Sequence, residues 1–236
     1  MIQPATRGVS GRRLLALLGL WAVLAGVSIG PTILALRLPL AAWTAAHGAL
    51  AGAVLLVEAY ATLLVALLLA FGGKAGLRDR LGFRFTSFGD LFVALGVWLL
   101  ALITGGVVAA LLTPITGMPP SNAVRILRLS SDPLFIGLVL PTICLLAPAC
   151  EELLFRGAVF GWLRLRLPVL PAAALSAALF AGAHLLPALF PELFIFGLAA
   201  AWIYQRSGST LNSFAMHASQ NTLATIAAYA VLRTGG

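Results

Sequence analysis

The sequence is poor in charged residues, and this shortage excludes most classes of soluble protein. Of its 236 residues, 9% are Asp, Glu, Lys or Arg and 61% are hydrophobic. An ordinary soluble domain has about 25% charged and about 45–50% apolar residues. So few polar side chains cannot cover a soluble globule of this size. The composition excludes soluble enzymes, nucleic-acid-binding proteins and disordered proteins, and it predicts an integral membrane protein.

Acidic residues and cysteines are also scarce. Seven Asp and Glu residues stand against fifteen Lys and Arg residues, which gives a formal net charge of +8. A basic balance can indicate nucleic-acid binding, but here long hydrophobic runs separate the cations, which is typical of the loops of a membrane protein. The two cysteines, Cys144 and Cys150, lie in one such run at a spacing that is poor for a disulfide within a helix.

Long hydrophobic runs are abundant, and they predict an all-α fold: a polytopic bundle of about seven membrane-spanning helices, with six to eight as the range. A span requires about 20 hydrophobic residues. The runs cover residues 14–36, 48–71, 91–112, 134–163, 171–186, 193–204 and 211–232. The fifth and sixth are short, which leaves a re-entrant or strongly kinked segment open there. We expect residues 1–236 to form a single membrane domain with a motif-bearing core at about 134–232.

The distribution of basic residues predicts a cytoplasmic N-terminus. In this orientation ten cations lie inside and four outside, leaving out Arg156 within a run, and cytoplasmic loops are the ones enriched in Lys and Arg. The basic residues are fourteen Arg and one Lys beside abundant Ala and Leu, which suggests a bacterial genome. We therefore expect a multi-pass protein of the bacterial inner membrane, with membrane lipids as its surroundings.

Charged residues inside the fourth run are the strongest sign of function. A charge within a span costs about 2.5–3.5 kcal/mol on insertion scales, so such residues are rare and usually functional. Glu152 and Arg156 are four residues apart and share a helix face, where they can form an ion pair. Glu151 is rotated by about 100° from that face. Pro148 frees the carbonyl of Cys144, which favours a hydrated pocket at Glu151 over an ordinary helix end in which both acids neutralise Arg156.

Two further pairs with helical spacing lie in later runs: Phe180 with His184, and His217 with Asn221. A lone intramembrane His or Asn often makes only an interhelical hydrogen bond. Polar groups on three of the last four runs are explained most simply by one shared site. A carboxylate and a neutral His can activate water, directly or on a metal. A second His and an amide can stabilise the oxyanion formed at a peptide carbonyl.

These patterns resemble a known family, the CAAX prenyl endopeptidase and bacteriocin-processing (CPBP, or Abi) intramembrane proteases. The family's motifs match Glu151-Glu152-x-x-x-Arg156, Phe180-x-x-x-His184 and His217-x-x-x-Asn221, in this order and on successive hydrophobic runs. The specific part covers about residues 148–221. The N-terminal half matches only in hydropathy and in the stretch 81–84.

The resemblance implies a membrane-embedded peptidase. Its expected reaction is the hydrolysis of a peptide bond, in a lipidated (CAAX-like) or membrane-associated peptide, by an activated water. The catalytic residues that the resemblance implies have three roles. Glu151 and His184 activate the water, His217 and Asn221 stabilise the oxyanion, and Glu152 with Arg156 supports the site as an ion pair.

Three alternatives stay open at this point. The reaction can use a bound zinc, with Glu151, His184 and His217 as candidate ligands, or a metal-free glutamate mechanism. The protein can instead be a transporter or proton-coupled carrier, because intramembrane Glu, Arg and His also mark ion routes. It can also be a low-turnover membrane scaffold or immunity factor of the same family.

Two positions do not fit easily. Glu58 lies midway along the second run, and we expect it to pair with a polar neighbour or to be protonated rather than to form a second functional site. His184 is the other. In a straight fifth helix it lies too deep to meet Glu151, unless the segment is tilted or kinked at Ala181-Gly182.

Overall fold

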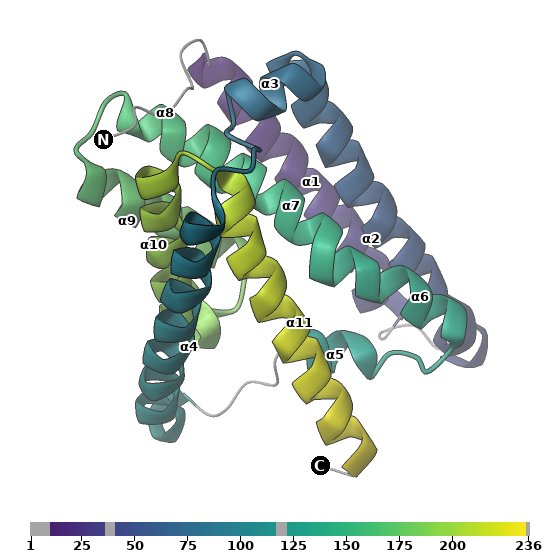
Figure 1. Cartoon of the computed structure of the whole chain (residues 1–236). Coiled ribbons are helices and arrows are strands. Elements are labelled where there is room, and N and C mark those ends of the chain that lie inside the picture. The colour runs from purple at the N-terminus through teal and green to yellow at the C-terminus, as the bar shows by residue number, and fades with distance from the viewer. Residues whose placement is uncertain (1–9, 36–40, 117–121, 235–236) are drawn as a thin grey trace.

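The computed structural model describes residues 10–35, 41–116 and 122–234, and over these residues the protein is helical, as the sequence predicts. In the first half the helices are α1 (Gly11–Ala35), α2 (Ala41–Phe71), α3 (Gly73–Asp79), α4 (Phe88–Thr116) and α5 (Asn122–Leu127). The second half contains α6 (Pro133–Pro141), α7 (Ala147–Glu152), α8 (Gly161–Arg164), α9 (Val169–Ala183), α10 (Phe190–Ser207) and α11 (Thr210–Thr234). In Figure 1, α4, α9 and α10 lie together on one side and α1, α2 and the segment α6–α7 on the other, with α11 packed between the two groups.

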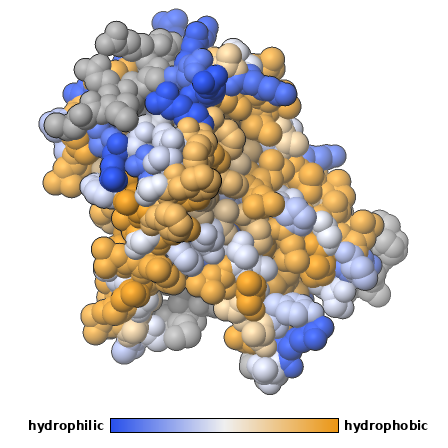
Figure 2. Space-filling view, in the orientation of Figure 1, coloured by the Kyte–Doolittle hydropathy of each residue, from blue (hydrophilic) through white to orange (hydrophobic). Residues whose placement is uncertain are grey.

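The surface is suited to a membrane. Hydrophobic side chains cover most of the visible face, and hydrophilic ones concentrate at the end that carries α3 and α8 (Figure 2). Within the described residues, four helical stretches are long and hydrophobic enough to cross a bilayer: Gly48–Phe71, Phe88–Pro114, Pro133–Arg164 and Pro187–Ser207. These correspond to the second, third, fourth and sixth predicted runs. The count of seven spans and the cytoplasmic N-terminus stay predictions; Arg7, Arg37 and Leu36 lie outside the described residues.

The fourth run forms one unbroken helical rod from Pro133 to Arg164, with two turns of wider π-helix, Thr142–Leu146 and Leu153–Phe160. It begins at a well-formed N-cap. The side chain of Asp132 accepts hydrogen bonds from the backbone of Leu134 and Phe135, and Pro133 occupies the first helical position, where its missing N–H has no cost. Because the rod extends to Arg164, Glu151 and Glu152 lie well inside it rather than at its end.

Helices α9 and α10 form a hairpin that enters and leaves the bundle at the same end (Figure 1). α9 has 15 residues, a length of about 22 Å at 1.5 Å per residue, which is shorter than the hydrocarbon core of about 30 Å. The prediction that it continues to Leu186 is wrong: the helix ends at Ala183, because Leu185 has a φ of 54°. The turn Pro187–Leu189 then leads into α10.

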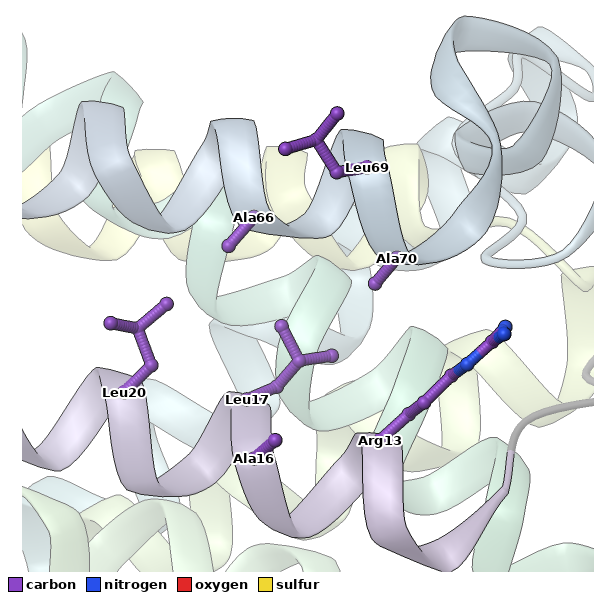
Figure 3. A pocket seen from close by; sticks show the side chains of 7 residues that line it. All are labelled: Arg13, Ala16, Leu17, Leu20, Ala66, Leu69 and Ala70. Atoms are coloured by element: carbon purple, nitrogen blue, oxygen red, sulfur yellow. The ribbon is translucent and has the colours of Figure 1, made fainter.

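Helices α1 and α2 pack against each other at the side of the rod (Figure 1). Between them lies a surface groove of about 440 Å³, with the side chain of Arg13 at its rim (Figure 3). The inner faces of the pair contribute Leu17, Leu63 and Leu67 to the main hydrophobic core, where they meet Leu154 and other residues of the rod. The core therefore joins the N-terminal helices directly to the segment that carries the acidic motif.

Candidate active site

The centre of the site is a buried ion pair within the rod. Arg156 Nη1 lies 2.9 Å from Glu152 Oε1, and the two side chains are 1% and 0% exposed. The guanidinium also lies over the ring of Phe180, 4.4 Å from the ring centroid, and its other terminal nitrogen donates to the carbonyl of Gly197 at 3.5 Å. The predicted pair is therefore present, and neighbouring helices contact it from two further sides.

His217 connects the two acidic residues of the motif. Its Nδ1 lies 3.0 Å from Glu152 Oε1, and its Nε2 lies 3.8 Å from Glu151 Oε2. An ionised carboxylate can only accept a hydrogen bond, so Nδ1 is the donor in the contact with Glu152. That contact fixes the ring and directs Nε2 toward Glu151. The helix α11 thus brings His217 to the acidic motif as the sequence predicts.

Glu151 is held from the opposite side by the N-terminal half of the chain. The hydroxyl of Tyr60, on α2, donates to Glu151 Oε1 at 2.6 Å, and Glu151 itself is 6% exposed. The two oxygens of this carboxylate therefore have different neighbours. Oε1 is occupied by Tyr60, while Oε2 faces His217 across a gap too long for a direct hydrogen bond.

Phe180 places the second histidine. Its ring centroid lies 4.8 Å from that of His184 and 5.6 Å from that of His217, so both imidazoles contact the same aromatic ring. His184 caps α9, with Nδ1 2.9 Å from the carbonyl of Phe180. The meeting of His184 with Glu151 stays a prediction, because the contacts described for His184 are with Phe180 and the end of α9. Of the two ways in which the sequence would allow that meeting, a tilt of the segment or a kink at Ala181-Gly182, the second would lie within α9, because both residues belong to the helix.

Asn221 contacts the rod at its upstream π-helical turn. Its amide nitrogen donates to the carbonyl of Ile143 at 2.7 Å. The sequence predicts instead that the carbonyl of Cys144 is freed by Pro148. The difference arises because the helix is π-helical here: the backbone N–H of Ala147 donates to the carbonyl of Thr142, five residues earlier. In this register a backbone N–H at position 148 would donate to the carbonyl of Ile143, and Pro148 has no such N–H.

A polar junction at the end of the bundle sets the position of α11. The backbone N–H of Thr210 donates to the carbonyl of Gly82 at 2.9 Å, and the hydroxyl of Ser209 donates to the carbonyl of Arg84 at 2.5 Å. Gly82 has a φ of +75°, and a Cβ there would lie 2.6 Å from the carbonyl oxygen of Gly208. The predicted stretch 81–84 therefore has a structural role, because it fixes the start of the helix that carries His217 and Asn221.

The structure does not gather the predicted zinc ligands. Among the side chains that the structure describes, no three from His, Cys, Asp or Glu are arranged to hold a metal ion. Glu151 and His217 are close, but His184 does not complete a three-ligand set with them. The donor set as placed does not fit a zinc site of three protein ligands. The cysteines, Cys144 and Cys150, are both free thiols, as their spacing predicts.

Two residues near the site were not predicted from the sequence. Tyr60 carries no charge and lies in a hydrophobic run, where a tyrosine usually has a packing role. Gln220 accepts a hydrogen bond from the indole of Trp98 at 2.8 Å, which attaches α11 to α4 next to Asn221. The depth of Tyr60 within its span is the one signal that could have pointed to it. In the same run, the charge of Glu58 attracts attention in the sequence, but its side chain is exposed on the outer surface.

Comparison with known proteins shows that part of the chain matches one protein family. Residues 133–223 match the family described as Type II CAAX prenyl endopeptidase Rce1-like, which confirms the resemblance inferred from the motifs. Neither the curated proteins nor the solved structures include a match to the chain. The matched segment contains all six predicted site residues. It supports a membrane endopeptidase of the CAAX type in general.

Proposed function

Starting from the match to the CAAX prenyl endopeptidases, we propose that this protein is an intramembrane endopeptidase. It hydrolyses a peptide bond in a lipidated, CAAX-like or membrane-associated peptide. The observation that carries the proposal is the arrangement at His217, whose two ring nitrogens face the two carboxylates of the Glu151-Glu152 motif at 3.8 and 3.0 Å. An acid and an imidazole that face the same gap are the groups needed to activate water and to stabilise an oxyanion.

Glu151 acts as the general base. The 3.8 Å gap between its Oε2 and His217 Nε2 is suited to a water that contacts both groups. Glu151 takes one proton from this water while the water oxygen bonds to the peptide carbonyl carbon. The C–N bond then breaks, and the leaving amine receives the proton from Glu151. Tyr60 leaves Oε2 as the oxygen available for this transfer.

His217 stabilises the oxyanion in this scheme. With Nδ1–H held by Glu152, a protonated ring presents its Nε2–H toward the negative charge that develops on the carbonyl oxygen. Asn221 has a second amide proton besides the one it donates to Ile143, and we assign that proton to the same oxyanion. His184, whose Nε2 is not engaged by Phe180, helps to orient the water.

No step in this scheme passes through zinc, because the candidate ligands are not gathered as placed. We expect dialysis of the purified protein against a chelator to leave the cleavage rate within about two-fold of the untreated rate. Loss of activity that added zinc restores would instead support the metallopeptidase alternative. The measurement is the initial rate before and after dialysis, with the magnesium-loaded chelator as a control for nonspecific effects.

The direct test is cleavage by the purified, reconstituted protein. Substrates are a farnesylated CAAX peptide and a hydrophobic peptide without a lipid, with products identified by mass spectrometry. Losing a general base typically lowers turnover by about 10²–10⁴-fold, and we expect a loss in this range for Glu151→Gln. The matched control is Glu58→Gln, which makes the same change in a span but on the outer surface; it should cleave at the wild-type rate.

Two outcomes would contradict the proposal. Equal rates for wild type and Glu151→Gln would remove Glu151 from the reaction. A wild-type protein that cleaves none of the peptides, while its vesicles show proton-coupled solute flux, would favour the carrier. The family match covers all six predicted residues and favours the peptidase over that alternative.

A further inference from the structure

Helix α2 supplies a contact to the site that lies outside the matched segment. The match begins at residue 133, whereas Tyr60 precedes Glu151 by 91 residues. The hydrogen bond from the phenol to Glu151 Oε1 is 2.6 Å long, the length expected of an O–H donor on an ionised carboxylate. This contact therefore attaches the N-terminal half of the molecule to the residue that we assign as general base.

The backbone around Tyr60 is fixed independently of its side chain. The thiol of Cys150, the residue before Glu151, donates to the carbonyl of Tyr60 at 3.4 Å, and Cys150 is fully buried. One and two turns further along α2, Leu63 and Leu67 lie in the main core with exposures of 1% and 0%. The helix thus stays in place without the hydroxyl, which makes the hydroxyl a separable feature.

The two oxygens of Glu151 have been given different surroundings by this contact. Oε1 accepts from Tyr60 at 2.6 Å, and Oε2 lies 3.8 Å from His217 Nε2. A carboxylate free to rotate would present either oxygen, or neither, to the gap beside His217. With Tyr60 in place, rotation requires breaking a charge-assisted hydrogen bond within a buried site.

We propose that Tyr60 is a positioning residue that selects Glu151 Oε2 as the oxygen facing the attacking water. The inference rests on the proposed function, since it assigns a role within that reaction. It predicts a specific kinetic signature. Misplacing a general base lowers the rate of the chemical step, while peptide binding at the surrounding helices is retained.

The kinetic test is Tyr60→Phe, which removes one oxygen atom and keeps the ring. Hydrogen bonds to charged groups are worth about 1.5–3 kcal/mol, so we expect kcat to fall about 10- to 150-fold with KM within about two-fold of wild type. The matched control is Tyr204→Phe. Tyr204 is a buried tyrosine that packs on Phe160 in a separate part of the core, and kcat of this variant should be unchanged. An unchanged kcat in Tyr60→Phe, with Glu151→Gln inactive, would overturn this inference alone.

A second measurement does not depend on turnover. The chain has three tyrosines, so Tyr204→Phe with Tyr229→Phe leaves Tyr60 as the only one, and a ring-carbon NMR label then reports a single phenol. We expect its Cζ resonance to move on Glu151→Gln and to stay in place on Glu58→Gln. If the Cζ resonance of Tyr60 does not move on Glu151→Gln, the contact is absent and the inference is overturned. A wild type without any peptidase activity would overturn the proposed function, and this positioning role with it, even if the resonance moves.

Discussion

The charged side chains of the acidic motif, within residues 133–223, differ in burial from those of the helix pair α1–α2. In the first region, Glu152, Arg156 and His217 are buried and in contact with one another. In the second, Glu58 lies on the outer surface, and Arg13 borders an open groove between the two helices. A charge within a hydrophobic run therefore indicates a site only when neighbouring helices supply its partners. Tyr60 is the exception that connects the two regions, because it lies on α2 but contacts Glu151.

The largest contrast between these regions should be obtained by removing an arginine from each. Arg156→Ala leaves Glu152 buried without its cation and removes the contact with Phe180. Breaking a buried pair in this way costs about 3–5 kcal/mol. Arg13→Ala should change the free energy of unfolding by less than about 0.5 kcal/mol, as is usual for surface substitutions. Denaturant unfolding in detergent measures both, and equal losses would contradict the distinction drawn here.

Glycines provide a second comparison, of packing rather than charge. A Cβ on Gly197 of α10 would lie 2.8 Å from the Cβ of Ala177 on α9, whereas a Cβ on Gly19 of α1 meets nothing within 4 Å. Gly197→Ala should therefore destabilise the protein by about 1–3 kcal/mol through overpacking. Gly19→Ala should stabilise it by about 0.5–1 kcal/mol, because Ala favours a helix interior. Two shifts of the same sign in thermal unfolding would argue against the tight α9–α10 contact.

The hydrogen bond of Asn221 offers a sharper test, because a compensating change is available. Asn221→Ala leaves the partly buried carbonyl of Ile143 without its donor. A fully buried unsatisfied acceptor costs about 1–3 kcal/mol, so we expect a loss of stability toward the low end of that range. Adding Pro148→Ala restores a backbone N–H in the register that reaches Ile143. We expect the double variant to recover part of the stability lost, but none of any activity lost, since the amide is still missing. If Pro148→Ala does not improve the stability of Asn221→Ala, the assignment of this register is wrong.

Much of the fold and the ion pair of the acidic motif could be predicted from the sequence, because the information is local. Hydrophobic runs bounded by charges gave the all-α bundle and the approximate limits of four candidate spans. The residue types at Asp132 and Pro133 are those of a helix start, and the helix α6 begins there. The spacing of Glu152 and Arg156 gave their ion pair without any knowledge of other helices. Each of these inferences depends on residues within a few turns of one another.

The unpredicted features depend on distant segments. Tyr60 and Glu151 meet across 91 positions, and nothing near Tyr60 distinguishes it from a packing residue. The end of α9 at Ala183 depends on the backbone conformation of Leu185, a leucine that no helix-stop rule would select. The partner of Ile143 comes from α11. The spacing of the motifs indicates that Glu151, Glu152 and His217 share a site, but it does not indicate which imidazole nitrogen faces which carboxylate oxygen.

The smallest expected effect concerns Glu58, the charged residue that most resembles a site by position alone. It lies midway along the span Gly48–Phe71 but on the outer surface of α2, whereas Tyr60, two residues later, reaches inward. Because the side chain at position 58 is exposed, we expect its surroundings to change little when the helices separate. Glu58→Leu should therefore leave turnover within about two-fold, and the free energy of unfolding in a bilayer within about 0.5 kcal/mol. A larger loss in either, measured beside Glu151→Gln, would mean that Glu58 has a partner in the membrane and that the two regions are less different than their burial indicates.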